Sequence, residues 1–167
     1  MIRKAKPGEQ DHLTEISFAS KKYWDYPSDF FTIWQDELTI TADYIRNNNV
    51  YVYESDDQIS AYYSLKILEK DLHIGEVEFT AGVWLDHMFV QPQSIKKSIG
   101  TQLFKHCIFI CSTLDMPQNF SSLHILADPN AAGFYLKLGC KYMQEYPSSI
   151  AGRTTPYLKY NLTMAET

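Results

Sequence analysis

The sequence lacks a basic excess, a long apolar run and a cysteine framework. Its 20 acidic residues outnumber its 15 lysines and arginines, which gives a formal net charge of −5. Proteins that bind the phosphate backbone of nucleic acids usually carry a basic excess or stripe, so this composition disfavours that class. No apolar run approaches the roughly 20 residues that a membrane-spanning helix needs. We therefore expect neither a nucleic-acid partner nor a membrane partner.

The cysteines are three, Cys107, Cys111 and Cys140, and their odd number disfavours a secreted disulfide scaffold. Cys107 and Cys111 lie one helical turn apart, but no Cys or His follows at a metal-ligand spacing. We therefore predict buried thiols and no metal site. The basic segment 1–7 leads into no apolar stretch, unlike a signal peptide, which favours a cytoplasmic protein.

What the chain does contain is typical of a globular α+β domain. It has 167 residues, of which 45% are apolar and 21% charged, enough for a substantial core. There is no repeat, low-complexity stretch or linker, so we predict one domain over residues 1–167.

Apolar periodicity and turn residues predict the order of the elements. The expected helices span 9–23, 30–37, 41–47 and 101–111, and a further helix follows Asn130 and ends at Gly139. The expected strands span 2–4, 50–53, 59–67, 123–127, 141–146 and 157–162, with the second and third forming a hairpin. The stretch 76–90 is predicted to hold a strand, a turn near Ala81 and Gly82, and a second strand.

The stretch from Phe89 to Gly100 predicts an anion-binding site. An apolar strand runs into Pro92, a short polar loop follows, and a helix begins near Thr101. Backbone N–H groups and the helix dipole at such a junction suit a phosphate or pyrophosphate, and Lys96 and Lys97 add positive charge. An ordinary strand-to-helix connection with solvated lysines is the alternative.

A second motif, Asn130-Ala-Ala-Gly-Phe-Tyr-Leu-Lys-Leu-Gly139, resembles the last conserved segment of the GCN5-related N-acetyltransferases. The stretch from Phe89 to Phe104 resembles the acetyl-CoA segment of the same family, with Val-x-Pro, a pyrophosphate loop and a helix. The two motifs lie in the expected order, about 30 residues apart. The order of the predicted elements resembles the family over nearly the whole chain.

This resemblance implies a splayed mixed, mostly antiparallel sheet flanked by helices, with acetyl-CoA as co-substrate. The pantetheine would pair with the backbone of Met88, Phe89 and Val90, like an added strand. The pyrophosphate would bind the N–H groups of Lys96, Lys97, Ser98, Ile99, Gly100 and Thr101.

The loop departs from the family pattern at two of its three motif positions. The family usually has Gln or Arg, two residues, Gly, one residue, then Gly or Ala; here these positions are Ile95, Ser98 and Gly100. Serine presents an N–H and a hydroxyl but lacks glycine's freedom to adopt positive φ. We expect this departure to bear on cofactor affinity more than on cofactor identity.

The resemblance also implies catalytic roles. Tyr135 would protonate the thiolate that leaves CoA; a core tyrosine with a satisfied hydroxyl is the alternative. Asn130 would cap the last helix, contact the cofactor, or both. Asp86 or His87, on the strand before Val-x-Pro, would take the proton of the amine directly or through a water. Strand alternation puts these two side chains on opposite faces, and Glu76 and Glu78 are weaker contenders.

Two further segments suggest the acceptor site. The first, Lys21-Lys-Tyr-Trp-Asp-Tyr-Pro-Ser28, offers Trp24 and Tyr26 for stacking on a flat or cationic group. The second, Ser148-Ser-Ile-Ala-Gly-Arg-Thr-Thr-Pro156, offers Arg153 for a two-point contact with a carboxylate. In this family both regions border the acceptor. A packed aromatic lid and a turn-stabilising arginine are the alternatives.

The sequence therefore predicts an N-acetyltransferase that moves an acetyl group from acetyl-CoA directly to the amine of a small molecule or peptide. The rival is a non-catalytic acyl-CoA-binding or sensing domain of the same fold, which the altered loop favours. A generic nucleotide-binding module is disfavoured because the chain lacks a glycine-rich P-loop and a magnesium-site pattern. Aromatic residues outside the predicted core are compatible with a homodimer.

Overall fold

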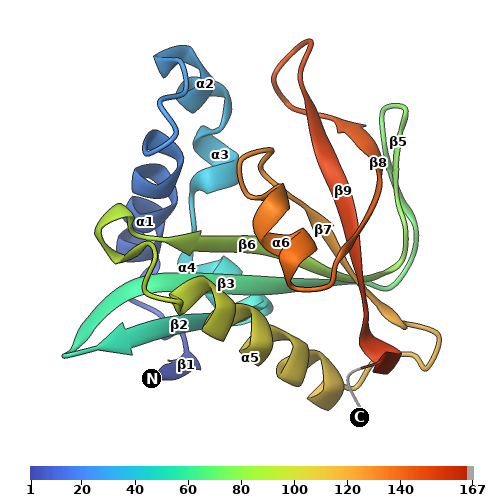
Figure 1. Cartoon of the computed structure of the whole chain (residues 1–167), viewed down its shortest axis with the longest axis horizontal. Coiled ribbons are helices and arrows are strands. Elements are labelled where there is room, and N and C mark those ends of the chain that lie inside the picture. Colours follow the sequence, from blue (N-terminus) through green and yellow to red (C-terminus); the bar gives the residue numbers. More distant parts are fainter. Residues whose placement is uncertain (165–167) are drawn as a thin grey trace. The chain divides into compact units, whose positions relative to one another are not determined.

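The computed structural model describes residues 1–164 and has the predicted mixture of helices and strands. Its larger sheet has seven strands in the order β1-β2-β3-β6-β7-β9-β8, and β4 and β5 form a separate two-stranded sheet (Figure 1). The strands are β1 Ile2–Lys4, β2 Asn49–Ser55, β3 Gln58–Leu68, β4 Leu72–Ile74, β5 Val77–Phe79, β6 Gly82–Val90, β7 Ser122–Leu126, β8 Lys141–Pro147 and β9 Thr154–Asn161. The helices are α1 Gln10–Lys22, α2 Ser28–Ile33, α3 Gln35–Leu38, α4 Ala42–Asn47, α5 Ile99–Thr113 and α6 Ala132–Lys137.

The described chain divides into two compact units. The first unit contains Met1–Leu65 and His87–His106, and the second contains Lys66–Asp86 and the described residues from Cys107 onward. Strands β3 and β6 and helix α5 each contribute residues to both units. The single-domain organisation over 1–167 remains a prediction, and residues 165–167 lie outside the described part.

The first unit is built on the antiparallel pairs β1–β2 and β2–β3. Apolar residues of α1, of the α3–α4 region and of these strands form one buried cluster: Leu13, Ile16, Ile40, Ile45, Val50, Val52, Ile59 and Tyr62. Inside it the Tyr62 hydroxyl lies 2.5 Å from the Ser17 hydroxyl, so the one polar atom of this buried ring is satisfied.

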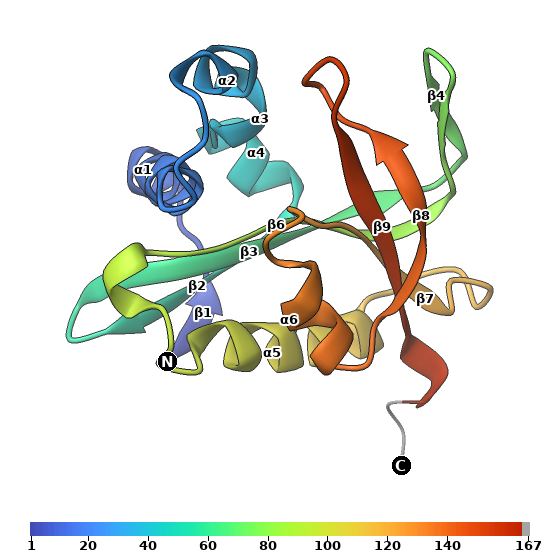
Figure 2. The ribbon, with the colours of Figure 1, turned by 45° about the horizontal axis from the view of Figure 1, so that its top comes forward.

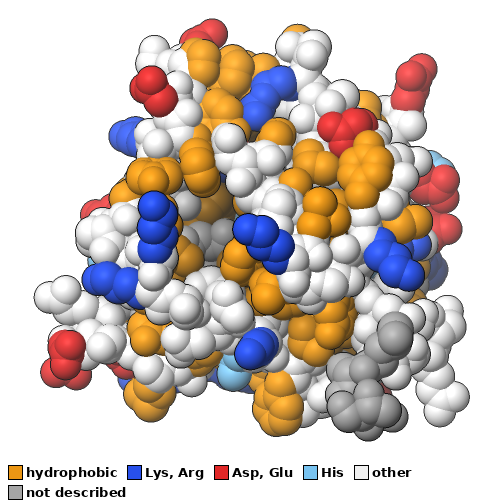
Figure 3. Space-filling model, in the orientation of Figure 1, with side chains coloured by type: hydrophobic (Ala, Val, Ile, Leu, Met, Phe, Trp, Pro, Cys, Tyr) orange, Lys and Arg blue, Asp and Glu red, His pale blue; other side chains and the backbone are white. Residues whose placement is uncertain are grey.

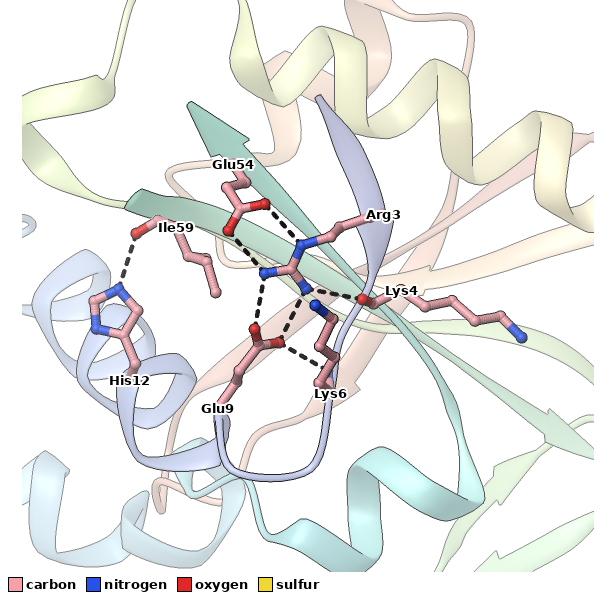
Figure 4. A network of polar contacts seen from close by, with 7 residues as sticks. All are labelled: Arg3, Lys4, Lys6, Glu9, His12, Glu54 and Ile59. Atoms are coloured by element: carbon pink, nitrogen blue, oxygen red, sulfur yellow. Dashed lines mark hydrogen bonds and ion pairs between the residues drawn. The ribbon is translucent and has the colours of Figure 1, made fainter. Parts of the chain in front are cut away.

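An ion-pair network fixes the start of the chain in the first unit (Figure 4). The guanidinium of Arg3 donates to both carboxylate oxygens of Glu54, at 2.8 and 2.9 Å, and to both of Glu9, at 2.8 and 3.2 Å. Hydrogen bonds from Arg3 lower the pKa of Glu54, and those from Arg3 and the Lys6 N–H lower the pKa of Glu9 although partial burial opposes this. The two-point geometry ties β1 to β2 and to the first turn of α1.

One predicted helix is wrong in its extent. The stretch 30–37 is two short helices, α2 and α3, separated at Trp34. Trp34 is only 4% exposed, and its ring makes edge contacts with Tyr26, Phe30 and Phe31 at centroid distances of 5.1–5.6 Å. The helical periodicity therefore breaks where the indole is buried.

The second unit contains the parallel pair of the sheet. Strand β6 pairs with β7 in parallel over Val83–Leu85, and β9 pairs antiparallel with both β7 and β8. The β4–β5 hairpin lies beside the β8–β9 hairpin in both views (Figures 1 and 2), and the Tyr146 hydroxyl donates to the Glu78 carbonyl at 2.9 Å. Strand β4 and the turn at Gly75, whose φ of +62° suits glycine, were not predicted from the sequence.

A close approach at Gly82 shapes the core of this unit. A methyl group on Gly82 would lie 2.7 Å from Nε2 of His124, and the φ of +150° already disfavours other residues. The His124 ring stacks on Trp84 at 4.7 Å, and its Nδ1 lies 2.6 Å from the Tyr157 hydroxyl. Burial, with a smaller contribution from the charge of Lys159, lowers the pKa of His124 to about 4, so the ring is neutral at pH 7.

Candidate functional site

The predicted anion loop follows β6 in the first unit. The Gln91 N–H donates to the Ser60 carbonyl at 2.8 Å, a 3-10 turn covers Pro92–Ser94, and α5 begins at Ile99. Lys96 and Ser98 both have positive φ, +66° and +59°. Ser98 therefore adopts a left-handed conformation that glycine reaches freely and serine reaches at a cost of about 1–2 kcal/mol.

The residues around this turn are mostly exposed and lead directly into a long helix. Ser98 is exposed, and its carbonyl accepts the N–H of Gln102, so α5 starts directly after it. The first N–H groups of an α-helix have no partner within the helix, and α5 is 15 residues long. Lys96 and Lys97 are also exposed, whereas Ile99 is buried and anchors the first turn. The loop thus combines backbone donors with two formal positive charges.

The residues predicted to pair with pantetheine lie at the end of β6. Met88, Phe89 and Val90 are all half-buried, and Phe89 packs against the apolar cluster of the first unit. The parallel register with β7 covers Val83–Leu85, whereas β6 itself continues to Val90.

His87 is held by hydrogen bonds on both ring nitrogens. Its Nε2 lies 2.9 Å from the Glu37 carbonyl, and because a carbonyl only accepts, Nε2 carries the hydrogen. Its Nδ1 lies 3.0 Å from the Ser64 hydroxyl and 3.2 Å from the Tyr44 hydroxyl. Nδ1 is therefore the nitrogen that accepts a hydrogen bond from these hydroxyls.

Asp86 belongs to a pocket in the second unit with a volume of about 240 Å³. Nine residues line it, of which seven are apolar and two charged: Lys66, Leu68, Leu72, Ile74, Phe79, Trp84, Leu85, Asp86 and Leu126. Of the predicted acid–base candidates, Asp86 lines this pocket; His87, Glu76 and Glu78 are not among its lining residues. Neither Lys66 nor the apolar lining was predicted from the sequence to belong to a site. The alternation of Leu72, Ile74, Val77 and Phe79 is the signal that would have found the hairpin wall.

Tyr135 lies on α6 in the second unit and is 6% exposed. Burial first, and then the neighbouring Cys107 and Cys140 thiols and the Asp128 carboxylate, raise the pKa of its phenol well above the usual range. The hydroxyl therefore stays protonated at pH 7, as a proton donor must.

The ends of α6 explain how Tyr135 is held. The Cys140 N–H donates to the Tyr135 carbonyl at 3.1 Å and the Gly139 N–H to the Leu136 carbonyl at 3.2 Å, which is a Schellman motif with Gly139 at φ +97°. The predicted cap at Asn130 is wrong: the N-cap is Ala131, without a side-chain bond. The Asn130 N–H instead donates to the Asp128 carboxylate at 2.8 Å, because Asp128 forms the turn before the helix.

Trp24 and Tyr26, the predicted stacking residues, lie in an aromatic segment of the first unit. Trp24 is 43% exposed and contacts Tyr23 edge to face, whereas Tyr26 packs against Trp34. The ammonium of Lys21 lies 4.7 Å from the Trp34 ring centre and 5.7 Å from that of Tyr26. Hydrophobic side chains gather at the surface over the region of α2 (Figure 3).

Arg153 follows the tip of the β8–β9 hairpin in the second unit and is half-buried. Its carbonyl accepts the Ser148 N–H at 2.9 Å and its N–H donates to the Ile150 carbonyl at 3.1 Å. Gly152, at φ +76°, completes this turn. The backbone of Arg153 is therefore fixed by the turn itself.

The cysteines of the described chain form no disulfide. All three thiols are free and buried, and burial raises the pKa of Cys140 to about 12. Within residues 1–164 there is no group of three or more His, Cys, Asp or Glu side chains that could hold a metal ion. No helix in that part of the chain has the length and apolar character to cross a membrane.

Comparisons with known proteins agree with this fold. Solved structures with the same fold include a GCN5-related N-acetyltransferase from Rhodopseudomonas palustris, with a TM-score of 0.74, 19% identity and coverage of 96% of this chain and 94% of that one. The PaiA N-acetyltransferase from Thermoplasma acidophilum, in complex with coenzyme A, has a TM-score of 0.71, 15% identity and coverage of 96% and 98%. The ribosomal-protein-S18-alanine N-acetyltransferase from Escherichia coli has a TM-score of 0.65, 13% identity and coverage of 99% and 95%.

At the level of sequence, no curated protein matches the chain. The family model described as "Acetyltransferase (GNAT) domain" matches residues 46–141, which include β6, the anion loop, α5 and α6. This match covers more than half of the chain, and the chain therefore belongs to the GNAT acetyltransferase family.

Proposed function

We propose that this protein transfers the acetyl group of acetyl-CoA to the amine of a small molecule or peptide. The observation that carries the proposal is the left-handed backbone at Ser98, directly before a 15-residue helix. Glycine adopts this backbone conformation freely, and Ser98 adopts it at the position where the family motif has Gly. The coenzyme A held by the Thermoplasma acidophilum neighbour is consistent with acyl-CoA use.

The residues of the loop fit the cofactor's charge and shape. In the proposal, the N–H groups of residues 96–101 bind the pyrophosphate, with Lys96 and Lys97 adding charge. The backbone of Met88, Phe89 and Val90 pairs with the pantetheine, and Asn130 contacts the cofactor. A backbone N–H near Val90 polarises the thioester carbonyl.

The chemistry is direct transfer. The neutral amine attacks the thioester carbonyl, the C–N bond forms and the C–S bond breaks, and the CoA thiolate takes the proton of the Tyr135 hydroxyl. We assign the proton lost by the amine to Asp86, directly or through a water, because Asp86 lines the pocket and His87 is not among its lining residues. His87 then acts as a positioning residue. We place Trp24, Tyr26 and Arg153 among the residues that border the acceptor.

Replacement of Tyr135 by Phe tests this proposal. Loss of a general acid typically costs 10²–10⁴-fold in rate, so we expect CoA release in the presence of amines to fall by about 100-fold or more. The affinity for acetyl-CoA should change by less than about two-fold, and Tyr142→Phe, at a tyrosine that is 53% exposed, should leave both quantities unchanged. Equal activity of Tyr135→Phe and wild type would contradict the assigned role.

A second candidate is a non-catalytic acyl-CoA-binding domain. The presence of Ile95 and Ser98 where the family has Gln or Arg and Gly favours it. This candidate predicts acetyl-CoA binding by calorimetry together with no CoA release across a broad amine panel.

A further inference from the structure

The pocket of the second unit combines a mostly apolar lining with one cation and one anion. One apolar wall comes from the β4–β5 hairpin, which forms a sheet of its own. Leu72 and Ile74 line the pocket and His73 between them does not, as strand alternation requires. Both apolar side chains are largely exposed to solvent, at 43% and 60%, so a ligand between them would cover apolar surface.

The other apolar wall is rigid. The Trp84 ring stacks on His124 and Tyr157, and its indole N–H donates to the Thr80 carbonyl at 3.0 Å. Phe79 meets Trp84 edge to face at a centroid distance of 5.6 Å. A preformed aromatic wall favours a flat or branched apolar group over a flexible polar chain.

The charged lining consists of one cation and one anion. Lys66 lies on β3 and Asp86 on β6, which are neighbouring strands of the sheet. A ligand that carries both an ammonium and a carboxylate can engage both charges, whereas a polyamine would meet the like charge of Lys66. The volume of about 240 Å³ is below the range of about 300–1,000 Å³ for drug-sized ligands, and corresponds to a small molecule.

We infer that the acceptor is a small zwitterionic amine with an apolar or aromatic side group, such as an aromatic α-amino acid, bound in this pocket. This inference rests on the proposed N-acetyltransferase function and specifies its substrate class. The side group packs between Leu72, Phe79 and Trp84, and Lys66 pairs with the carboxylate. The ammonium meets Asp86, which is exposed and passes the first proton of the ammonium on to solvent. The neutral amine then attacks the thioester carbonyl, and Asp86 takes the second proton as the C–N bond forms.

The test compares ligands that differ in one group. L-phenylalanine carries both charges, phenethylamine lacks the carboxylate, 3-phenylpropionate lacks the amine, and spermidine is a polycation. Acetylation of the two monoamines and of spermidine is followed by product mass, and binding of all four is measured by calorimetry with CoA present. We expect the kcat/KM of L-phenylalanine to exceed those of phenethylamine and spermidine by at least about ten-fold.

Variants locate the effect in the pocket. Lys66→Gln should raise the KM for L-phenylalanine about ten-fold and leave that for phenethylamine within two-fold, while Lys70→Gln, at an exposed lysine outside the lining, changes neither. Leu72→Trp should narrow the pocket and weaken both aromatic ligands, whereas His73→Trp on the same strand should not.

The outcomes separate this inference from the proposed function. Turnover of phenethylamine or spermidine at least as efficient as that of L-phenylalanine, with no effect of Lys66→Gln, would overturn the substrate class and leave the acetyltransferase intact. Absence of acetyl-CoA binding would remove the proposed function. In that case calorimetry of L-phenylalanine with wild type and Lys66→Gln still judges the pocket, and equal or absent binding in both would overturn it.

Discussion

The predicted anion loop of the first unit and the pocket of the second unit present different groups to a ligand. The loop presents backbone N–H groups from a turn with left-handed residues at Lys96 and Ser98. The pocket presents side chains, seven of them apolar, around a single cation and a single anion. A backbone site tolerates changes of side chain as long as the turn is kept, whereas a side-chain site changes its ligand with each substitution. We therefore propose that acetyl-CoA binds at the loop and that the amine acceptor binds in the pocket.

The core behind the pocket, where His124 stacks on the lining residue Trp84, is expected to tolerate substitution less well than the loop, and Gly82→Ala should show this most strongly. The added methyl would lie 2.7 Å from Nε2 of the buried His124 at a φ of +150°. Overpacking and backbone strain together should lower the free energy of unfolding by about 4 kcal/mol. Gly133→Ala, in α6 with no atom within 4 Å of the new methyl, should instead stabilise slightly. Chemical denaturation of both variants checks the contrast, and equal stabilities would refute the close approach.

Acid should lower the stability of the same core, because it contains His124. The pKa of His124 is about 4 in the folded protein and about 6.5 in the unfolded chain, so between these values the unfolded chain binds a proton that the folded protein does not. The free energy of unfolding should therefore fall by about 3 kcal/mol as the pH drops from 6.5 to 4. His106, whose pKa burial also lowers, adds to the loss in the same direction.

Denaturation curves at several pH values measure this slope. In His124→Gln the fall between pH 6.5 and 5 should be smaller than in wild type, because the titrating group is gone. An unchanged slope in that variant would show that His124 is not the group responsible.

Asp86→Asn separates chemistry in the pocket from binding at the loop. Loss of the proton acceptor should lower kcat by about 100-fold, while the dissociation constant of acetyl-CoA stays within two-fold of wild type. Steady-state kinetics and calorimetry give the two quantities. His87→Gln serves as the comparison: if it lowers kcat more than Asp86→Asn does, the assignments of base and positioning residue must be exchanged.

The smallest expected effect is at the loop. Ser98→Gly removes a left-handed serine, and the relief of strain minus the entropy of glycine should stabilise the protein by about 0.5–1 kcal/mol. Affinity for acetyl-CoA should stay equal or rise slightly. Ser112→Gly, within α5, should have the opposite sign because glycine weakens a helix. A loss of acetyl-CoA affinity in Ser98→Gly would show that the serine hydroxyl, not the turn, holds the ligand.

Much of the fold was predictable because local patterns determine it. The β2–β3 hairpin, the long helix after the loop and the glycine at the end of α6 follow from alternation, periodicity and the need for positive φ at Gly139. The break at Trp34 was not predictable, because it depends on how the indole packs against neighbouring aromatic rings in the folded protein.

The loop and the pocket differ in how far the sequence alone predicts them. The loop residues are contiguous, so a single stretch of sequence predicted them. The pocket gathers Lys66, Phe79, Asp86 and Leu126 from different strands, and only the register of the folded sheet brings them to one lining. Ser98 shows a further limit: its conformation is imposed by the turn and the helix that follows, against the preference of the residue itself.

The most direct test is to incubate the protein with acetyl-CoA labelled in the acetyl group and a panel of amines, and to detect the products by mass spectrometry. The account predicts that the label appears on the nitrogen of an amine, with one CoA released for each acetylated product, and that Tyr135→Phe slows this transfer strongly. Tight binding of acetyl-CoA with no labelled amine from any member of the panel would contradict the proposed transfer.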